Sequence, residues 1–145
     1  MSHSAAALDS VFDAYRSAVY DKNVDAFVRL YADDVRIFDA WAEWSHDGAA
    51  AWRPAVEGWF ASLGSGRVRV RFDEVHILGG GELLHASAIV TYAAISASGE
   101  AIRAMQNRLT WLLRAGPPAR IVHEHTSAPI GLGDMKAMLH REQRQ

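Results

Sequence analysis

The sequence predicts an α+β fold in which helices pack on one face of a β-sheet. Three observations support this class. Apolar residues recur at helical spacing through most of the first 63 residues, strand-like alternation begins at residue 67, and turn-forming segments at 79–81, 98–99 and 116–118 divide the second half. Helices followed by an antiparallel meander are typical of a single layered domain.

Length and composition agree with one domain. The chain has 145 residues, of which 50% are hydrophobic and 22% charged. This apolar content is sufficient for a buried core and excludes an intrinsically disordered chain. We expect one domain over residues 1–145, with a core at about 5–129 and a C-terminal tail at 130–145.

Several classes of function are disfavoured. There is no cysteine, which excludes disulfides and thiolate chemistry, and the net charge of −2 provides no basic surface for nucleic acid. No apolar run is long enough to span a membrane, and the N-terminus does not resemble a secretion signal. Nucleotide-binding glycine motifs are absent. We therefore expect a cytoplasmic protein without a cofactor.

The first half predicts three helices and one strand. The first helix carries one apolar stripe, and Lys22 and Asn23 separate it from a short second helix around Phe27. A strand at 35–39 and a loop at 40–48 follow. A third helix then runs to a stop at 64–66. The stripe of the first helix consists of Leu8, Val11, Phe12, Tyr15, Ala18 and Val19.

The second half predicts four strands. Arginine and apolar residues alternate from 67 to 72, and the apolar parity changes at Val75, which predicts a β-bulge at Asp73 and Glu74. Further strands are expected at 83–96, 101–114 and 120–127. Within the tail, residues 134–141 are compatible with a short helix or a frayed end.

Two motifs resemble a known superfamily. Tyr31-Ala32-Asp33-Asp34 followed by Asp39, with Tyr15 upstream, resembles the ketosteroid isomerase branch of the nuclear transport factor 2-like superfamily. The segment Val-His-Glu-His-Thr-Ser-Ala-Pro at 122–129 resembles SnoaL-like proteins and the association domain of calcium/calmodulin-dependent kinase II. The resemblance extends from Leu8 to Pro129.

The resemblance implies a cone-shaped, cystatin-like α+β barrel. Three N-terminal helices would cover a curved antiparallel sheet, with a pocket at the open end and dimerisation through the outer sheet face. It also implies catalytic roles: Asp39 would be the base that moves a proton beside a carbonyl, and Tyr15 would bind the oxyanion. Thr110 occupies the position of the second acid, where its hydroxyl is a weaker donor.

Polar residues on the last two strands are further candidates. The resemblance points Arg108 and Glu124 into the pocket, where Arg108 would bind a ligand oxyanion or carboxylate, or pair structurally with Glu124. Residues on the same two strand faces are expected to bind the ligand as well. They are Gln106 and Thr110 beside Arg108, and Thr126 beside Glu124.

The Asp39 carboxylate and the nearby aromatic residues each have two interpretations. Asp39 is a base with a pKa raised by apolar neighbours, or it caps the loop that follows it. Trp41 and Trp44 line a pocket for a flat apolar ligand together with Phe60, or they close the end of the cone.

Histidines and large apolar residues on the sheet suggest an interface rather than a metal site. His123 and His125 have a spacing that can bind one metal, with His85 as a third ligand, but the resemblance requires none. We expect no metal and instead a homodimer contact. Its residues would be Leu109, Trp111, His123 and His125.

The leading hypothesis is therefore a protein that binds a small apolar ligand, with cofactor-free acid/base chemistry of the isomerase, cyclase or dehydratase type if it is an enzyme. The alternatives are a non-catalytic dimeric association domain and a ligand carrier. The small-molecule ligand itself stays unspecified.

Overall fold

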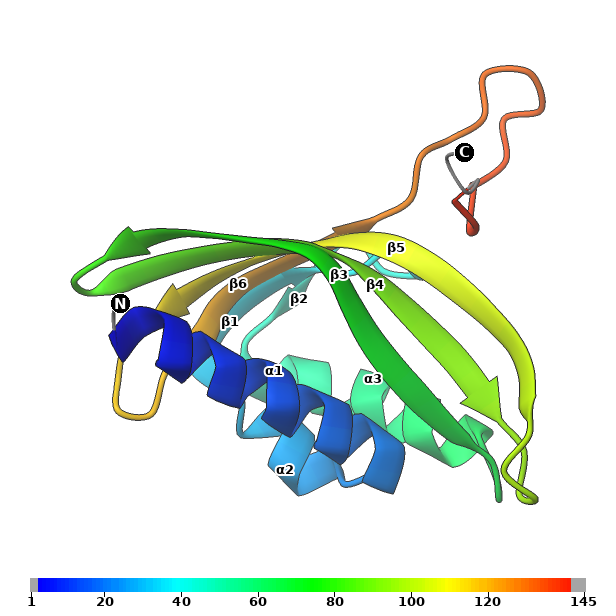
Figure 1. Cartoon of the computed structure of the whole chain (residues 1–145), viewed down its shortest axis with the longest axis horizontal. Helices are drawn as coiled ribbons and strands as arrows, with labels where there is room; N and C mark the ends of the chain where they lie inside the picture. Colours follow the sequence, from blue (N-terminus) through cyan, green and yellow to red (C-terminus); the bar gives the residue numbers. More distant parts are fainter. Residues whose placement is uncertain (1–2, 142–145) are drawn as a thin grey trace.

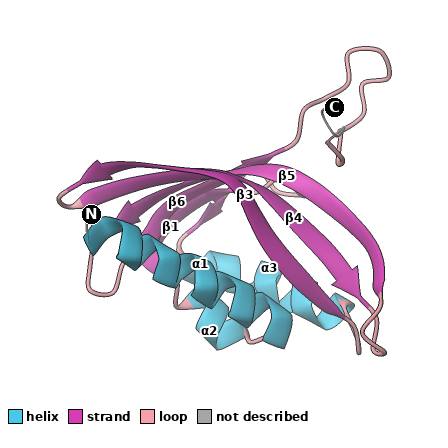
Figure 2. Cartoon of the chain, viewed as in Figure 1, coloured by secondary structure: helices cyan, strands magenta, loops and turns pink. Residues whose placement is uncertain are grey.

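The computed structural model describes residues 3–141, with side chains from residue 5 onward. In this part of the chain, three helices and a six-stranded sheet form two layers (Figures 1 and 2). The helices are α1 (His3–Asp21), α2 (Val24–Val28) and α3 (Ala49–Ser62). The strands are β1 (Tyr31–Phe38), β2 (His46–Asp47), β3 (Arg67–Gly80), β4 (Leu83–Ile95), β5 (Ala101–Arg114) and β6 (Arg120–Ser127).

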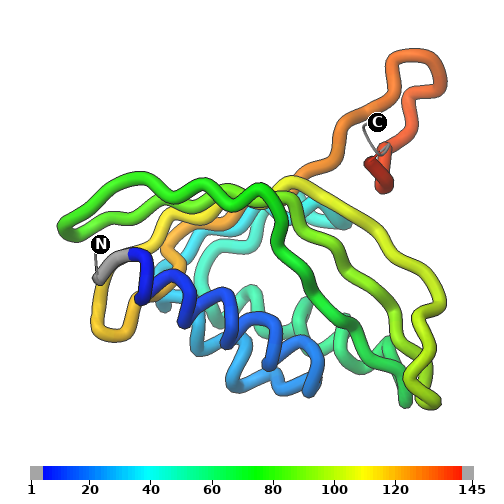
Figure 3. Tube along the Cα trace, viewed as in Figure 1, coloured from blue at the N-terminus to red at the C-terminus, as the bar shows by residue number. Residues whose placement is uncertain are grey.

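The sheet is open and curved. Its strand order is β2-β1-β6-β5-β4-β3, and neighbouring strands are antiparallel except β1 and β6, which run parallel. The long strands β3, β4 and β5 bend toward the helices, which lie on one face (Figure 3). The predicted α+β class and the curved sheet covered by helices are confirmed.

The bend of β3 coincides with a bulge. The pairing of β3 with β4 shifts register between Asp73 and His76, and Glu74 adopts a φ of 52°. An extra residue at a bulge bends its strand and moves the following side chains to the other face. The bulge predicted from the change of apolar parity is therefore present.

Aromatic side chains fill the space between the layers. Trp111 is wholly buried on β5, and its ring stacks on Phe12 of α1 at a centroid distance of 4.9 Å. Tyr15 and Phe72 lie 5.6 Å and 5.9 Å from the same indole. Because these rings occupy the middle of the fold, any ligand space must lie toward the edges of the sheet.

The C-terminal arm, residues 128–141, projects from the side of the sheet opposite the helices (Figure 1). It contains no helix, so the helical alternative for residues 134–141 is wrong. Instead, Ile130 pairs with Ala137 in an isolated bridge, and the Leu139 carbonyl accepts a hydrogen bond of 2.7 Å from the Gln106 amide. No helix among residues 3–141 combines the length and apolarity needed to cross a membrane.

Candidate functional site

Asp39 follows directly after β1, beside the end of β6. The parallel pairing of these strands places Phe38 opposite His125, so that Asp39 lies next to Thr126. The Thr126 hydroxyl donates a hydrogen bond of 3.1 Å to Asp39 Oδ1 and accepts one of 2.9 Å from the Ala40 amide. Thr126 therefore fixes both the carboxyl group and the loop that begins after it.

The surroundings of Asp39 make its carboxyl group a weaker acid than an exposed one. The side chain is half-buried, and this burial raises its pKa above the ordinary value. Hydrogen bonds from Thr126 and from the Trp41 amide, together with the charge of His46, oppose that rise in pKa. Asp39 thus accepts hydrogen bonds from the backbone of the loop, as a capping residue does. It is also partly desolvated, which suits a general base.

A cavity of about 460 Å³ opens beside Asp39. It lies between the loop that follows β1 and the end of β6, and its volume is within the range of small-molecule sites. Its walls combine aromatic, small apolar and acidic side chains. They are Phe38, Asp39, Ala40, Ala42, Glu43, Trp44, His125 and Thr126.

A second acid lies deeper, two residues before Thr126 on the inner face of β6. Glu124 is 2% exposed, and its Oε1 accepts hydrogen bonds from the Tyr31 hydroxyl at 2.7 Å and from Trp111 Nε1 at 2.8 Å. Burial raises the pKa of Glu124 to about 7, the two hydrogen bonds oppose the rise, and the charge of Asp39 adds to it. The two acids are therefore electrostatically coupled.

Two further tyrosines, the buried Tyr15 and the half-buried Tyr92, lie near these acids. The hydroxyl groups of Tyr15 and Tyr92 are 2.9 Å apart, and burial raises the pKa of both. The negative charges of Glu124 and Asp39 further raise the pKa of Tyr92. Tyr15 is 3% exposed in the core and does not line the cavity beside Asp39.

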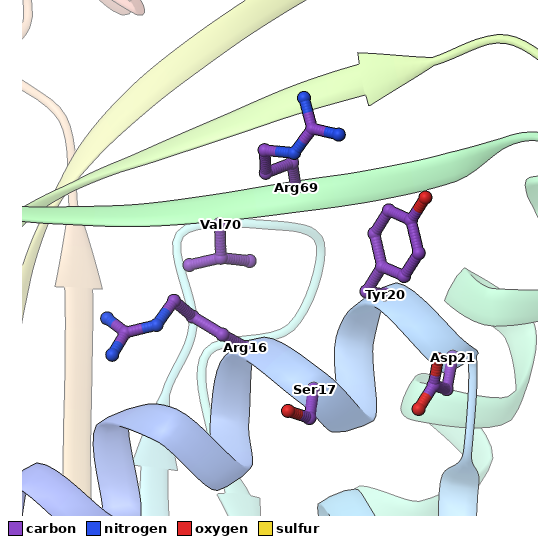
Figure 4. Close-up of a pocket in the computed structure, with 6 residues that line it drawn as sticks. All are labelled: Arg16, Ser17, Tyr20, Asp21, Arg69 and Val70. Atoms are coloured by element: carbon purple, nitrogen blue, oxygen red, sulfur yellow. The ribbon is translucent and has the colours of Figure 1, made fainter. Parts of the chain in front are cut away.

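Another cavity, of about 270 Å³, lies between α1 and β3 (Figure 4). Val70 points from β3 toward the helix, whereas Arg69 stands on the opposite side of the strand. Arg16 on its wall already pairs with Asp13, and both of those side chains are at the surface. This groove has no buried acid on its wall, so we place the candidate site at Asp39.

The expected inward direction of Arg108, Gln106 and Thr110 is wrong. Asn107, Leu109, Trp111 and Leu113 are the buried residues of β5, and the alternate positions lie on the outer face. Trp111 pairs in register with Glu124, so the two share the inner face. Arg108 is exposed and its Nε donates to Ser127 Oγ at 3.1 Å, away from Glu124.

Because the inner and outer faces of β5 are exchanged relative to expectation, two of the expected dimer residues are also misplaced. Leu109 and Trp111 are buried in the core and are not available to a partner chain. His123 and His125 do lie on the outer face, where the ring of Phe38 meets both at centroid distances of 5.2 Å and 5.5 Å. A homodimer stays a prediction, in which Leu109 and Trp111 cannot take part.

Of the three aromatic residues expected to bind the ligand, one lines the cavity and two do not. Trp44 lines the cavity and is 96% exposed, whereas Trp41 in the same loop is exposed but is not part of the cavity wall. Phe60 is buried against Phe27 and belongs to the core. The tryptophans therefore do not close the end of the fold.

Several residues of the site were not expected from the sequence. Phe38, Glu43 and His125 line the cavity, while Tyr31 hydrogen-bonds to Glu124 and Tyr92 to Tyr15. The apolar parity of β5 would have indicated the correct inner face. No local signal indicates that Tyr31 meets Glu124. No group of three or more His, Asp or Glu side chains suited to a metal occurs among the residues that the structure describes.

Comparison with known proteins assigns the family. SnoaL-like domains match residues 8–131 of the sequence. The chain is a SnoaL-like domain. A search of proteins with curated functions gave no significant match.

Solved structures similar to this SnoaL-like domain share its fold at low identity. A nuclear transport factor 2-like protein of unknown function from Pseudomonas putida KT2440 has a TM-score of 0.82 and 22% identity, over 99% of each chain. A protein of that family from Streptomyces avermitilis, provisionally described as a dehydratase, has a TM-score of 0.72 and 12% identity, over 88% of this chain and 97% of its own.

A third similar structure is from Xanthomonas campestris and is provisionally described as a calcium/calmodulin-dependent protein kinase II association domain. Its TM-score is 0.66 and its identity 16%, over 84% of this chain and 85% of its own. At such identities the likeness establishes the fold, and function must be argued from the site itself.

Proposed function

We propose that this SnoaL-like domain binds a small, largely apolar molecule in the cavity beside Asp39 and transfers a proton within it. Asp39 is the base, and His125, which also lines the cavity, donates a hydrogen bond to the oxygen on which negative charge develops. The reaction is the movement of a proton next to a carbonyl group, as in an isomerisation or a dehydration, and needs no cofactor.

One observation carries the proposal: a partly desolvated carboxyl group, oriented by Thr126, forms the wall of an open cavity. Burial raises the pKa of Asp39, which makes its carboxylate a stronger base than an exposed one. Glu124 does not line the cavity and takes no direct part in the reaction, because its Oε1 accepts hydrogen bonds from Tyr31 and Trp111 in the core. Arg108 has no role in this scheme.

The test uses a β,γ-unsaturated cyclic ketone, whose conversion to the conjugated ketone is followed by ultraviolet absorbance. We expect Asp39→Asn to lower turnover by roughly 10²- to 10⁴-fold with unchanged folding, since a general base contributes that much. His125→Gln should lower turnover by a smaller factor. His123→Gln is the matched control, because His123 lies on the same strand face outside the cavity.

An Asp39→Asn variant that is as active as the original protein would refute the role of the base. Absence of turnover together with saturable ligand binding would instead favour a ligand carrier. Circular dichroism of each variant separates lost chemistry from lost folding.

A second candidate function is association with another copy of this chain, which the C-terminal arm favours. The arm is fixed by its own hydrogen bonds, from the Gly131 amide to the Lys136 carbonyl and from the Met138 amide to the Pro129 carbonyl, both 2.8 Å. Its apolar side chains are nevertheless exposed, as in surfaces that a partner covers. They are Ile130, Leu132, Met135 and Met138.

Sedimentation velocity at micromolar concentration tests the association. We expect a dimer that Leu132→Ser weakens. A protein that is monomeric at this concentration would contradict the association function and leave the ligand site unaffected.

A further inference from the structure

The carboxylate side chains of the Asp39 cavity lie on its wall. Asp39 and Glu43 line it, His125 is its one further titratable wall residue, and neither lysine nor arginine forms part of its wall within residues 3–141. With Arg108 on the outer face and bonded to Ser127, its guanidinium is not available to bind a ligand carboxylate in the cavity. An anion here would meet two like charges, which disfavours its binding.

Aromatic faces accompany these carboxylates. Trp44 is 96% exposed at the cavity wall, so its indole face is free to contact a ligand. Phe38, on the same wall, already carries a cation of the protein, because the Arg36 guanidinium lies 4.8 Å from its ring centroid, so Trp44 is the aromatic side chain left to a ligand cation. Arg36 itself is directed to Asp47, with an Nε to Oδ1 distance of 3.6 Å, and does not line the cavity.

Aromatic faces beside carboxylates are the side-chain set that recognises ammonium groups in proteins. Of the three aromatic types, tryptophan binds cations most strongly through its face. A cation next to the half-buried Asp39 would also offset the unfavourable burial of its negative charge. The lining therefore favours positive charge in the ligand, and the flat indole surface favours a planar apolar body.

We propose that the cavity selects a planar, largely apolar ligand carrying a protonated amine, with the amine held between the Trp44 ring and the carboxylates of Asp39 and Glu43. This inference rests on the proposed function only in taking the cavity as the ligand site. It does not depend on proton transfer.

The test compares three probes of the same shape and different charge: 2-naphthylmethylamine, 2-naphthylmethanol and 2-naphthoate. Affinities are measured by isothermal titration calorimetry at neutral pH and low salt. We expect the amine to bind about tenfold more tightly than the alcohol, as a cation–π contact with an adjacent carboxylate allows, and the carboxylate to bind most weakly. Added salt should reduce this preference.

Variants identify the groups responsible. Glu43→Gln should lower the ratio of amine to alcohol affinity several-fold, because it removes one of the two carboxylates that attract the ammonium group. Trp44→Ala should weaken both probes. Glu57→Gln is the matched control, because Glu57 is an exposed acid of α3 that does not line the cavity.

Equal affinities for the amine and the alcohol, tighter binding of the carboxylate, or a Glu43→Gln variant with an unchanged ratio would each overturn the inference. If the alcohol binds without any preference for the amine, the charge selection is wrong while the cavity remains a ligand site. If none of the three probes binds at millimolar concentration, both the selection and the ligand site proposed above are wrong.

Discussion

The Tyr31 hydroxyl donates a 2.7 Å hydrogen bond to Glu124 Oε1 from a position 93 residues earlier in the chain. Tyr31 is 1% exposed and Glu124 2% exposed, so neither group can exchange this bond for one to bulk water. Trp111 Nε1 is the other donor to the same oxygen. A buried carboxyl group is tolerated here because two oriented donors solvate it.

Removal of the Tyr31 hydroxyl should therefore destabilise the fold. Tyr31→Phe leaves the Glu124 oxygen with one donor, and we expect a loss of about 1–3 kcal/mol in the free energy of unfolding. Urea denaturation monitored by tryptophan fluorescence measures it. Tyr20→Phe on the surface of α1 is the control and should change stability by no more than about 0.5 kcal/mol. Equal effects of the two substitutions would contradict the importance of this bond.

The raised pKa of Glu124 predicts how stability depends on pH. Burial raises its pKa from the ordinary value of 4.5 to about 7 in the folded protein. The folded state thus binds this proton more tightly than the unfolded chain does. The resulting stabilisation is complete below about pH 4.5 and is lost as the pH rises through about 7, a difference of about 3 kcal/mol at most.

Glu124→Gln should remove this contribution. The carboxamide oxygen can still accept from Tyr31 and Trp111, and the side chain no longer titrates. The free energy of unfolding of the variant, measured across this pH range, should therefore decline less toward neutral pH than that of the original protein. Asp39→Asn is a useful comparison, because burial also raises the pKa of Asp39 and gives a slope of the same sign. Parallel curves for the original protein and Glu124→Gln would show that Glu124 does not titrate in this range.

The last two residues of β3, before the turn into β4, provide a prediction about backbone conformation. Gly79 has a φ of +100°, and a Cβ atom there would lie 2.8 Å from the Leu83 carbonyl oxygen, whereas a Cβ on Gly80 would meet nothing within 4 Å. Gly79→Ala should thus cost about 1–3 kcal/mol, and Gly80→Ala, the matched control, should be close to neutral. Thermal unfolding of the two variants measures the difference, and similar melting temperatures would contradict it.

The strand pattern of the second half could be predicted from the sequence because it depends on local alternation. The bulge in β3 and the inner position of Glu124 were both expected, and both are present. The inward-facing side chains of β5 were predicted incorrectly, because the orientation of the strand's two faces was taken from the family resemblance. The apolar residues Leu109, Trp111 and Leu113 mark the inner face by themselves, and burial of apolar area decides which face of a strand is inside.

The cavity could not be predicted in the same way. Its walls come from a loop whose course depends on contacts distant in sequence, such as the bond from the Ala40 amide to Thr126, 86 residues away. Asp39 was identified through spacing alone. Glu43 and His125 come together at the cavity because β1 and β6 pair in parallel. A parallel pairing between strands so distant in the chain has no local sequence signal.

The hydroxyl of Thr126 should control the acidity of Asp39. Its hydrogen bond stabilises the carboxylate form, so its removal in Thr126→Val should raise the pKa of Asp39 further above the ordinary value, in the same direction as burial. Thr126→Ser keeps the hydroxyl and is the matched control. Titration of the Asp39 carboxyl carbon by ¹³C NMR measures the pKa directly, without any assumption about substrate.

In an active protein, the acid limb of the pH–rate profile should move to higher pH in Thr126→Val by the same interval, because the ionised base is then formed at higher pH. If the NMR titration moves and the rate profile does not, Asp39 is a residue that caps the loop, and the base must be sought elsewhere on the cavity wall.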